Sequence, residues 1–174
     1  MEGSFDSENK GTFTWSDAWV LASVAVGGGL KGCELNDVIA AGDLVNRAIF
    51  NADELRSGLV KLMNARFVEH AGGFYVLSGD ARAAVEELIA DGASNFSVMQ
   101  FFEDFLAVDP YAEPEHLPEE ECPLEHLTDR DIEAATAVYR SYFGALWRDL
   151  QKIDSDTLSE RAVRILEEAA SRKG

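Results

Sequence analysis

The stretch that decides the fold is residues 51–77, NADELRSGLVKLMNARFVEHAGGFYVL. Asn51 and Glu54 have the spacing of a capping box, in which each side chain accepts a hydrogen bond from a free backbone N–H of the first helical turn. The following apolar residues recur every three or four positions, which places them on one helix face: Leu55, Leu59, Leu62 and Met63. After Arg66 the pattern changes to two short β-rich runs on either side of Gly72-Gly73, which is typical of a hairpin. We therefore predict a helix over Asp53–Ala65 and paired strands within residues 67–77.

Two further helices are predicted before this stretch. The first starts with Thr14 or Ser16 as its cap, is apolar almost all round, and ends at the glycine triplet 27–29. The second covers Glu34–Ala41, and we expect Gly42-Asp43 to interrupt it before the chain reaches the third helix.

The chain after the hairpin is predicted to be helical with one irregular connector. A fourth helix spans Asp80–Ala90, and a fifth follows Ser94 or Ser97. Residues 107–128 contain all four prolines and many glutamates, so we expect an exposed, mobile connector. The longest helix covers about 129–153, and a last helix after residues 154–156 would pair with it as an antiparallel hairpin.

The order of three helices and a β-hairpin over residues 14–90 resembles the winged-helix family of bacterial regulators. The expected fold is mainly α, a winged helix-turn-helix followed by a C-terminal helical hairpin. The expected organisation is a loose N-terminus at 1–13, the winged domain at 14–92, a connecting helix at 93–106, the acidic connector at 107–128 and the helical hairpin at 129–174.

The resemblance implies that the outward face of the third helix enters a DNA major groove. That face carries residue types that can contact bases or phosphates, and the candidate DNA-binding residues are Arg56, Ser57, Val60, Lys61, Asn64 and Arg66. An ordinary solvated helix face is the alternative. Asp53 and Glu54 at the helix start, and a hairpin tip without Lys or Arg, weigh against DNA.

Charge is the most informative global property of the chain, which has 174 residues and a net charge of −17. Residues 103–133 hold twelve acidic residues against Arg130 alone, and residues 1–90 hold thirteen acidic residues against seven basic ones. Most non-specific affinity for nucleic acid comes from Lys and Arg contacts to phosphate, and this chain has few to spare. Two functions therefore stay open: a DNA-binding transcriptional regulator, or a winged-helix protein–protein interaction module that does not bind DNA and turns residues 107–128 toward a basic partner.

No motif indicates catalysis or a resident cofactor. His116, Cys122 and His126 lie in the acidic connector, but their spacing matches no standard zinc pattern, so we expect no metal site. Glycine patterns for nucleotides and the common hydrolase and metalloprotease signatures are absent, so we expect no enzyme activity. The acidic, polar start is unlike a signal peptide, no apolar run is long enough to span a membrane, and two cysteines form no disulfide framework, all of which favours the cytoplasm.

The long C-terminal helix carries a stripe of large apolar residues with two interpretations. The stripe either packs on the winged domain as core or forms the interface of a homodimer, and both can hold for different members. The candidate interface residues are Tyr139, Tyr142, Phe143, Leu146 and Trp147.

Overall fold

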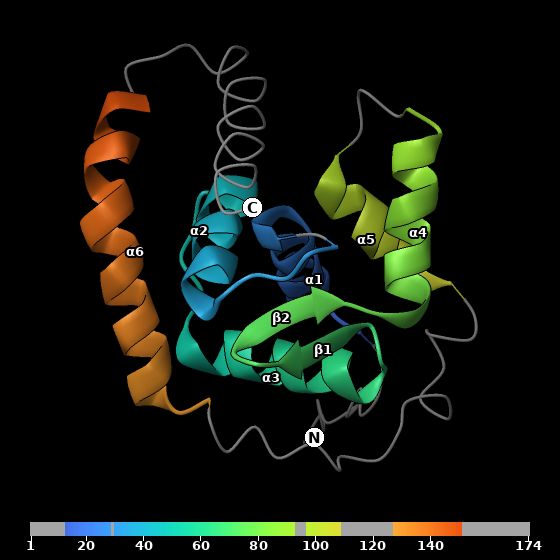
Figure 1. The fold of residues 1–174 in the computed structure, drawn as a ribbon, viewed down its shortest axis with the longest axis horizontal. Coiled ribbons are helices and arrows are strands. Elements are labelled where there is room, and N and C mark those ends of the chain that lie inside the picture. The colour runs from blue at the N-terminus through green and yellow to red at the C-terminus, as the bar shows by residue number, and fades with distance from the viewer. Residues whose placement is uncertain (1–12, 29, 93–96, 109–126, 151–174) are drawn as a thin grey trace, which may run out of the picture.

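The computed structural model describes residues 13–28, 30–92, 97–108 and 127–150, with side chains of the last segment described as far as Ser141. This part of the chain is mainly helical, with a small antiparallel sheet (Figure 1). The elements, in chain order, are α1 (Trp15–Gly28), α2 (Leu35–Asn46), α3 (Ala52–Asn64), β1 (Val68–Ala71), β2 (Phe74–Leu77), α4 (Gly79–Ala90), α5 (Val98–Ala107) and α6 (Asp129–Leu150).

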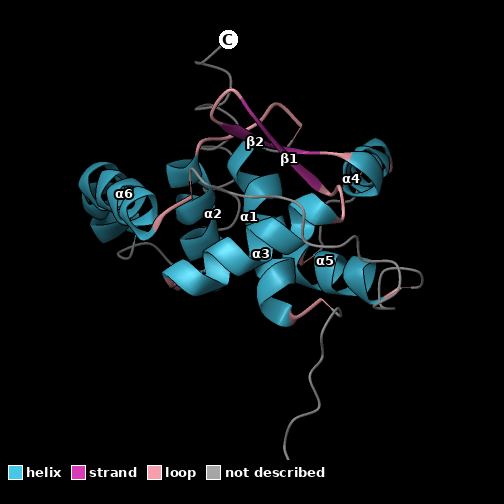
Figure 2. Ribbon diagram, turned by 90° about the horizontal axis from the view of Figure 1, so that it is seen from below, coloured by secondary structure: helices cyan, strands magenta, loops and turns pink. Residues whose placement is uncertain are grey.

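Helix α1 forms the centre of the core. It packs against α2, α3 and α5, which surround it in Figure 2, and every residue from Asp17 to Val24 is buried. The predicted all-round apolar character of this helix is thereby explained. Gly58 of α3 lets the two helices approach closely, since a Cβ added there would lie 2.7 Å from Val20 Cγ2.

The third helix and the hairpin form as the sequence predicts, with α3 within one residue of the expected bounds at each end. The Asn51 side chain accepts a hydrogen bond from Glu54 N at 2.8 Å, and the Glu54 carboxylate accepts one from Asn51 N at 3.2 Å. Strand β1 pairs with β2 from Val68↔Leu77 to Ala71↔Phe74. Gly72 and Gly73 link the strands with φ of +60° and +87°, the conformation that a two-residue type I′ turn requires.

The predicted interruption of the second helix at Gly42-Asp43 is wrong, because α2 continues to Asn46. Gly42 is needed for packing: a Cβ at this position would overlap the Phe50 ring. Its carbonyl also accepts a hydrogen bond from Trp19 Nε1 at 2.9 Å, and the Trp19 and Phe50 rings stack with centroids 3.8 Å apart. The helix instead ends at Asn46, and its C-cap residue Arg47 has φ +55° and donates its N–H to the Asp43 carbonyl.

Helix α6 lies along α2, as Figure 1 shows in orange at the left. Thr128 and Asp131 cap its start as predicted: Thr128 N donates to Asp131 Oδ2 at 2.8 Å, and Asp131 N donates to Thr128 Oγ1 at 3.3 Å. The core also includes three residues from α6 and the segment before it: Leu127, Ile132 and Tyr139. The predicted last helix and most of the predicted acidic connector, including residues 109–126 and 151–174, lie outside the described residues.

Candidate nucleic-acid interface on helix α3

Helix α3 has the two faces that its periodicity predicts. Its inward side buries Leu55, Gly58, Leu59 and Leu62. Five of the six candidate residues lie on α3: Ser57 is exposed, and Arg56, Val60, Lys61 and Asn64 are half-buried. The sixth, Arg66, is exposed and lies two residues beyond the end of the helix. The contacts of each basic side chain decide what this part of the surface can bind.

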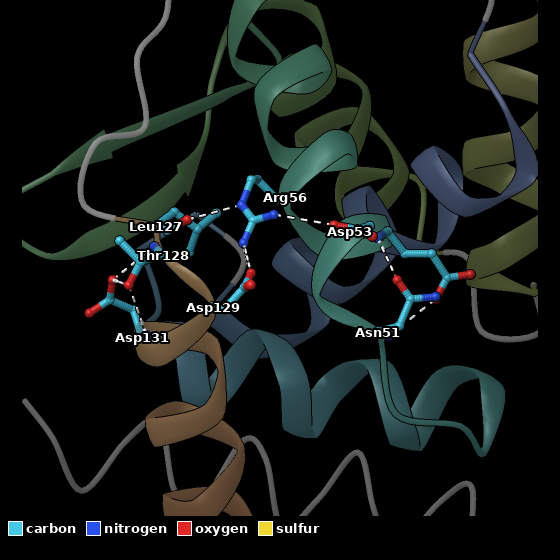
Figure 3. A network of polar contacts seen from close by, with 8 residues as sticks. Asn51, Asp53, Arg56, Leu127, Thr128, Asp129 and Asp131 are labelled. Atoms are coloured by element: carbon cyan, nitrogen blue, oxygen red, sulfur yellow. Dashed lines mark hydrogen bonds and ion pairs between the residues drawn. The ribbon is translucent and has the colours of Figure 1, made fainter.

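Arg56 is occupied by contacts within the chain (Figure 3). Its Nε donates to the Leu127 carbonyl at 3.1 Å, Nη1 lies 3.3 Å from Asp53 Oδ1, and Nη2 pairs with Asp129 Oδ1. One guanidinium therefore joins the first turn of α3 to the start of α6. Because two carboxylates and a carbonyl face its donors, a phosphate at this position would have to displace them.

Lys61 pairs with a residue of α1, whereas Arg56 pairs with the start of α6. Its Nζ lies 2.9 Å from Asp17 Oδ2, and the Asp17 side chain is only 3% exposed. The same oxygen accepts hydrogen bonds from Thr14 N at 2.7 Å and Thr14 Oγ1 at 3.0 Å. Asp17 lies in the first turn of α1, where a negative charge favours the helix, and it also binds α3 through Lys61. This pair ties α1 to α3 and neutralises a buried carboxylate, which is a structural task.

Arg66 differs from the other two basic residues. Its side chain is exposed and has no ion-pair partner among the described residues. Its backbone adopts φ +60° and its carbonyl accepts a hydrogen bond from Ser78 Oγ at 2.9 Å, which fixes the connection between α3 and the hairpin. Arg66 is the one candidate base whose guanidinium the described contacts leave available for a ligand.

The hairpin beside α3 adds no positive charge. Residues 68–77 contain no Lys or Arg, and the exposed tip consists of Ala71, Gly72, Gly73 and Phe74. His70 packs its ring against Tyr75 with centroids 4.6 Å apart. Burial, and to a smaller extent the charges of Asp131 and Cys33, together raise the pKa of Tyr75 to about 12. Tyr75 therefore stays neutral, and the negative charge at the start of α6 contributes to its raised pKa.

The start of α6 is the feature that the sequence could not place. Asp129 contacts Arg56, and Asp131 lies close enough to Tyr75 to raise its pKa, so both carboxylates add negative charge beside α3 and the hairpin. The sequence shows these residues as part of an acidic run, yet carries no local signal that the run returns to α3. The electrostatic balance of this face is thus more negative than its own residues indicate.

The described residues hold no group of three or more His, Cys, Asp or Glu side chains that could bind a metal ion. His116, Cys122 and His126, which we expect not to form a metal site, lie outside the described range. A hollow of about 240 Å³ opens between the start of α1 and the end of α5.

The candidate dimer residues fall into two groups. Tyr139 is buried within the chain and donates its hydroxyl to the Asp43 carboxylate of α2, and burial together with that hydrogen bond raises its pKa. Tyr139 therefore follows the core interpretation. Tyr142, Phe143, Leu146 and Trp147 lie on the part of α6 whose side chains are not described.

Comparison of the chain with protein-family models, curated proteins and solved structures gives no match. Among the described helices, none combines the length and the apolar character needed to cross a membrane.

Proposed function

We propose that this chain is a non-enzymatic regulatory protein built on a winged-helix module, and that it binds a basic protein partner rather than DNA. The proposal rests on the ion pairs of helix α3. Of the three candidate basic residues, two, Arg56 and Lys61, are bound to carboxylates of the same chain.

The arrangement of elements supports the winged-helix interpretation. Helices α1, α2 and α3 precede an antiparallel hairpin, and the segment between α1 and α2 joins that hairpin through Cys33. Cys33 N donates to the Tyr75 carbonyl at 2.9 Å, and Tyr75 N donates to the Cys33 carbonyl at 2.8 Å.

Charge supports a basic protein as the partner. The chain carries −17, and the start of α6 adds Asp129 and Asp131 to the side where DNA would approach. Within roughly 8 Å, the screening length at physiological salt, local charges dominate the interaction with phosphate. Near α3 those local charges are largely paired or negative, so they attract Lys and Arg rather than a phosphate backbone.

A DNA-binding regulator remains the second candidate, and Arg66 favours it. Arg66 is exposed between the end of α3 and β1, and Ser57 and Asn64 are polar candidates on α3 itself. A DNA site could use these three residues without disturbing Arg56 or Lys61. One arginine supplies roughly one phosphate contact, which is little against a strongly acidic body.

Fluorescence anisotropy with labelled DNA separates the two candidates. Random and genomic duplexes are titrated with the protein at low salt, where electrostatic attraction is strongest. We expect no saturable binding, and no change with Arg66→Ala. Arg66→Ala is a cleaner probe than Lys61→Ala, because Lys61 neutralises buried Asp17 and we expect its loss to destabilise the protein. Saturable binding that Arg66→Ala weakens would favour the DNA-binding regulator.

The protein-binding arm uses the same samples. A labelled lysine- and arginine-rich peptide replaces the duplex, and an acidic peptide of equal length serves as the control. We expect binding of the basic peptide alone, with an affinity that falls as salt rises. Absence of any basic-peptide binding at low salt would overturn the proposed partner class.

A further inference from the structure

We infer that the hollow between α1 and α5 is the site that receives one lysine or arginine side chain of a basic protein segment. This inference rests on the proposed function and deepens it by assigning the partner's cationic side chain to a place on the molecule. The hollow is lined by Phe13, Thr14, Trp15, Ala18, Glu103, Leu106 and Ala107. Helices α1 and α5, which border it, pack against each other in the core (Figure 2).

Size restricts what the hollow can hold. Its volume is about 240 Å³, whereas pockets for drug-sized ligands and cofactors typically measure about 300–1,000 Å³. A single long side chain matches this smaller volume. Phe13, Ala18 and Leu106 supply apolar walls against which the methylene stem of such a side chain can lie.

Charge determines the sign of the occupant. Glu103 is half-buried in the wall and has no hydrogen-bond or ion-pair partner among the described residues. The last turn of α5 and the first turn of α1 also border the hollow, and their helix-end charges, roughly −0.5 and +0.5, oppose each other. Asp17 in that first turn of α1 is paired with Lys61. The full negative charge of Glu103 therefore remains and attracts a cation.

Trp15 adds an aromatic surface suited to the same ligand. Trp15 is one of the residues that line the hollow, and it is 48% exposed, so it is open to solvent at this place. Ammonium and guanidinium groups bind indole faces more strongly than other aromatic rings. A carboxylate and an indole in one small apolar hollow are the elements that recognise a Lys or Arg side chain, and Arg can also stack its planar group on the indole.

Chemical-shift mapping with short peptides tests the site. Blocked pentapeptides of glycine with a central arginine, lysine or norleucine are titrated into ¹⁵N-labelled protein, and the indole N–H of Trp15 and the amides of Trp15, Glu103 and Ala107 are followed. We expect saturable shifts with the arginine and lysine peptides and none with norleucine, which has the apolar stem without the charge. Equal shifts with norleucine would overturn the inference.

Two neighbouring acids provide a matched pair of variants. Glu103→Gln and Asp104→Asn remove the same charge from adjacent positions, but Asp104 is exposed and its carboxylate accepts a hydrogen bond from Gln100 Nε2 at 2.9 Å. We expect Glu103→Gln to weaken binding about tenfold, as for loss of a hydrogen bond to a charged group. Asp104→Asn should change it less than about twofold, because an exposed charge acts through screened solvent. Equal effects would show long-range attraction without a site.

Trp15→Leu keeps an apolar wall and removes the ring, which should weaken binding about threefold. If this variant fails to fold, the comparison of Glu103→Gln with Asp104→Asn still decides. Basic-peptide shifts located elsewhere on the molecule, with none at the hollow, would overturn this site and leave the proposed function standing. No shift with any basic peptide would overturn both.

Discussion

Replacing Lys61 by Met should destabilise the protein more than the same replacement of Arg56. Lys61→Met leaves the carboxylate of Asp17, which is 3% exposed, without its only described counter-charge. Breaking a fully buried ion pair by removing one partner costs roughly 3–5 kcal/mol. Lys61 itself is 33% exposed, and Asp17 keeps both Thr14 hydrogen bonds, so we expect a smaller loss, about 2 kcal/mol.

Arg56→Met removes more contacts but costs less. Its carboxylate partners are exposed, and exposed ion pairs contribute only about 0–1 kcal/mol each. The hydrogen bond to the Leu127 carbonyl adds about 1 kcal/mol. Because both ion pairs are to exposed carboxylates, we expect a total loss of about 1 kcal/mol, half that of Lys61→Met.

Urea unfolding followed by circular dichroism measures both losses. With a slope of about 2 kcal/mol per M, the midpoint should fall by about 1 M for Lys61→Met and about 0.5 M for Arg56→Met. A double-mutant cycle with Asp17→Asn should give a coupling energy of about 1–2 kcal/mol. A larger loss for Arg56→Met, or additive effects of Asp17→Asn and Lys61→Met, would refute the assignment of Lys61 as partner of the buried carboxylate.

Three further predictions test other parts of the structure. Gly42→Ala should lower the free energy of unfolding by about 1–3 kcal/mol, because the added methyl overlaps the Phe50 ring; calorimetry showing a more stable variant would contradict this. The pKa values of Tyr75 (about 12) and Tyr139 are raised in the folded chain, so their contributions to stability are complete below pH 10 and are lost as pH rises from 10 through 12. The free energy of unfolding should therefore fall over this pH range, and it should fall less steeply in Tyr75→Phe. A free energy of unfolding that does not change with pH would contradict the burial of these tyrosines. Light scattering at micromolar concentration should show a dimer that Trp147→Glu weakens, whereas a monomer at high concentration would assign the stripe to the core.

The elements that the sequence predicted well are those with local signals. The capping residues Asn51 and Glu54, the three- and four-residue spacing in α3 and the Gly72-Gly73 turn all lie within a few residues of the structure they specify. Thr128 and Asp131 marked the start of α6 for the same reason. Helix caps and two-residue turns depend on neighbours in the chain, so a sequence pattern contains the required information.

The features that the sequence did not predict depend on distant residues. Gly42 reads locally as a helix breaker, yet the Trp19 and Phe50 rings make it a packing position within α2. Arg56 meets Leu127 and Asp129 across 71 and 73 residues, and Lys61 meets Asp17 across 44. No periodicity indicates such pairs. The periodicity of the sequence was enough to separate the buried face of α3 from its outward face, while the pairing of the charges on α3 could be seen only in the tertiary structure.

One NMR experiment tests the central claim most directly, because it observes α3 itself. ¹⁵N-labelled protein at low salt receives an unlabelled DNA duplex, and a second sample receives the arginine-centred peptide. We expect DNA to leave the amides of Ser57, Val60 and Asn64 unshifted and the peptide to shift those of Trp15 and Glu103. Saturable shifts of the α3 amides with DNA would contradict it and establish α3 as a nucleic-acid interface.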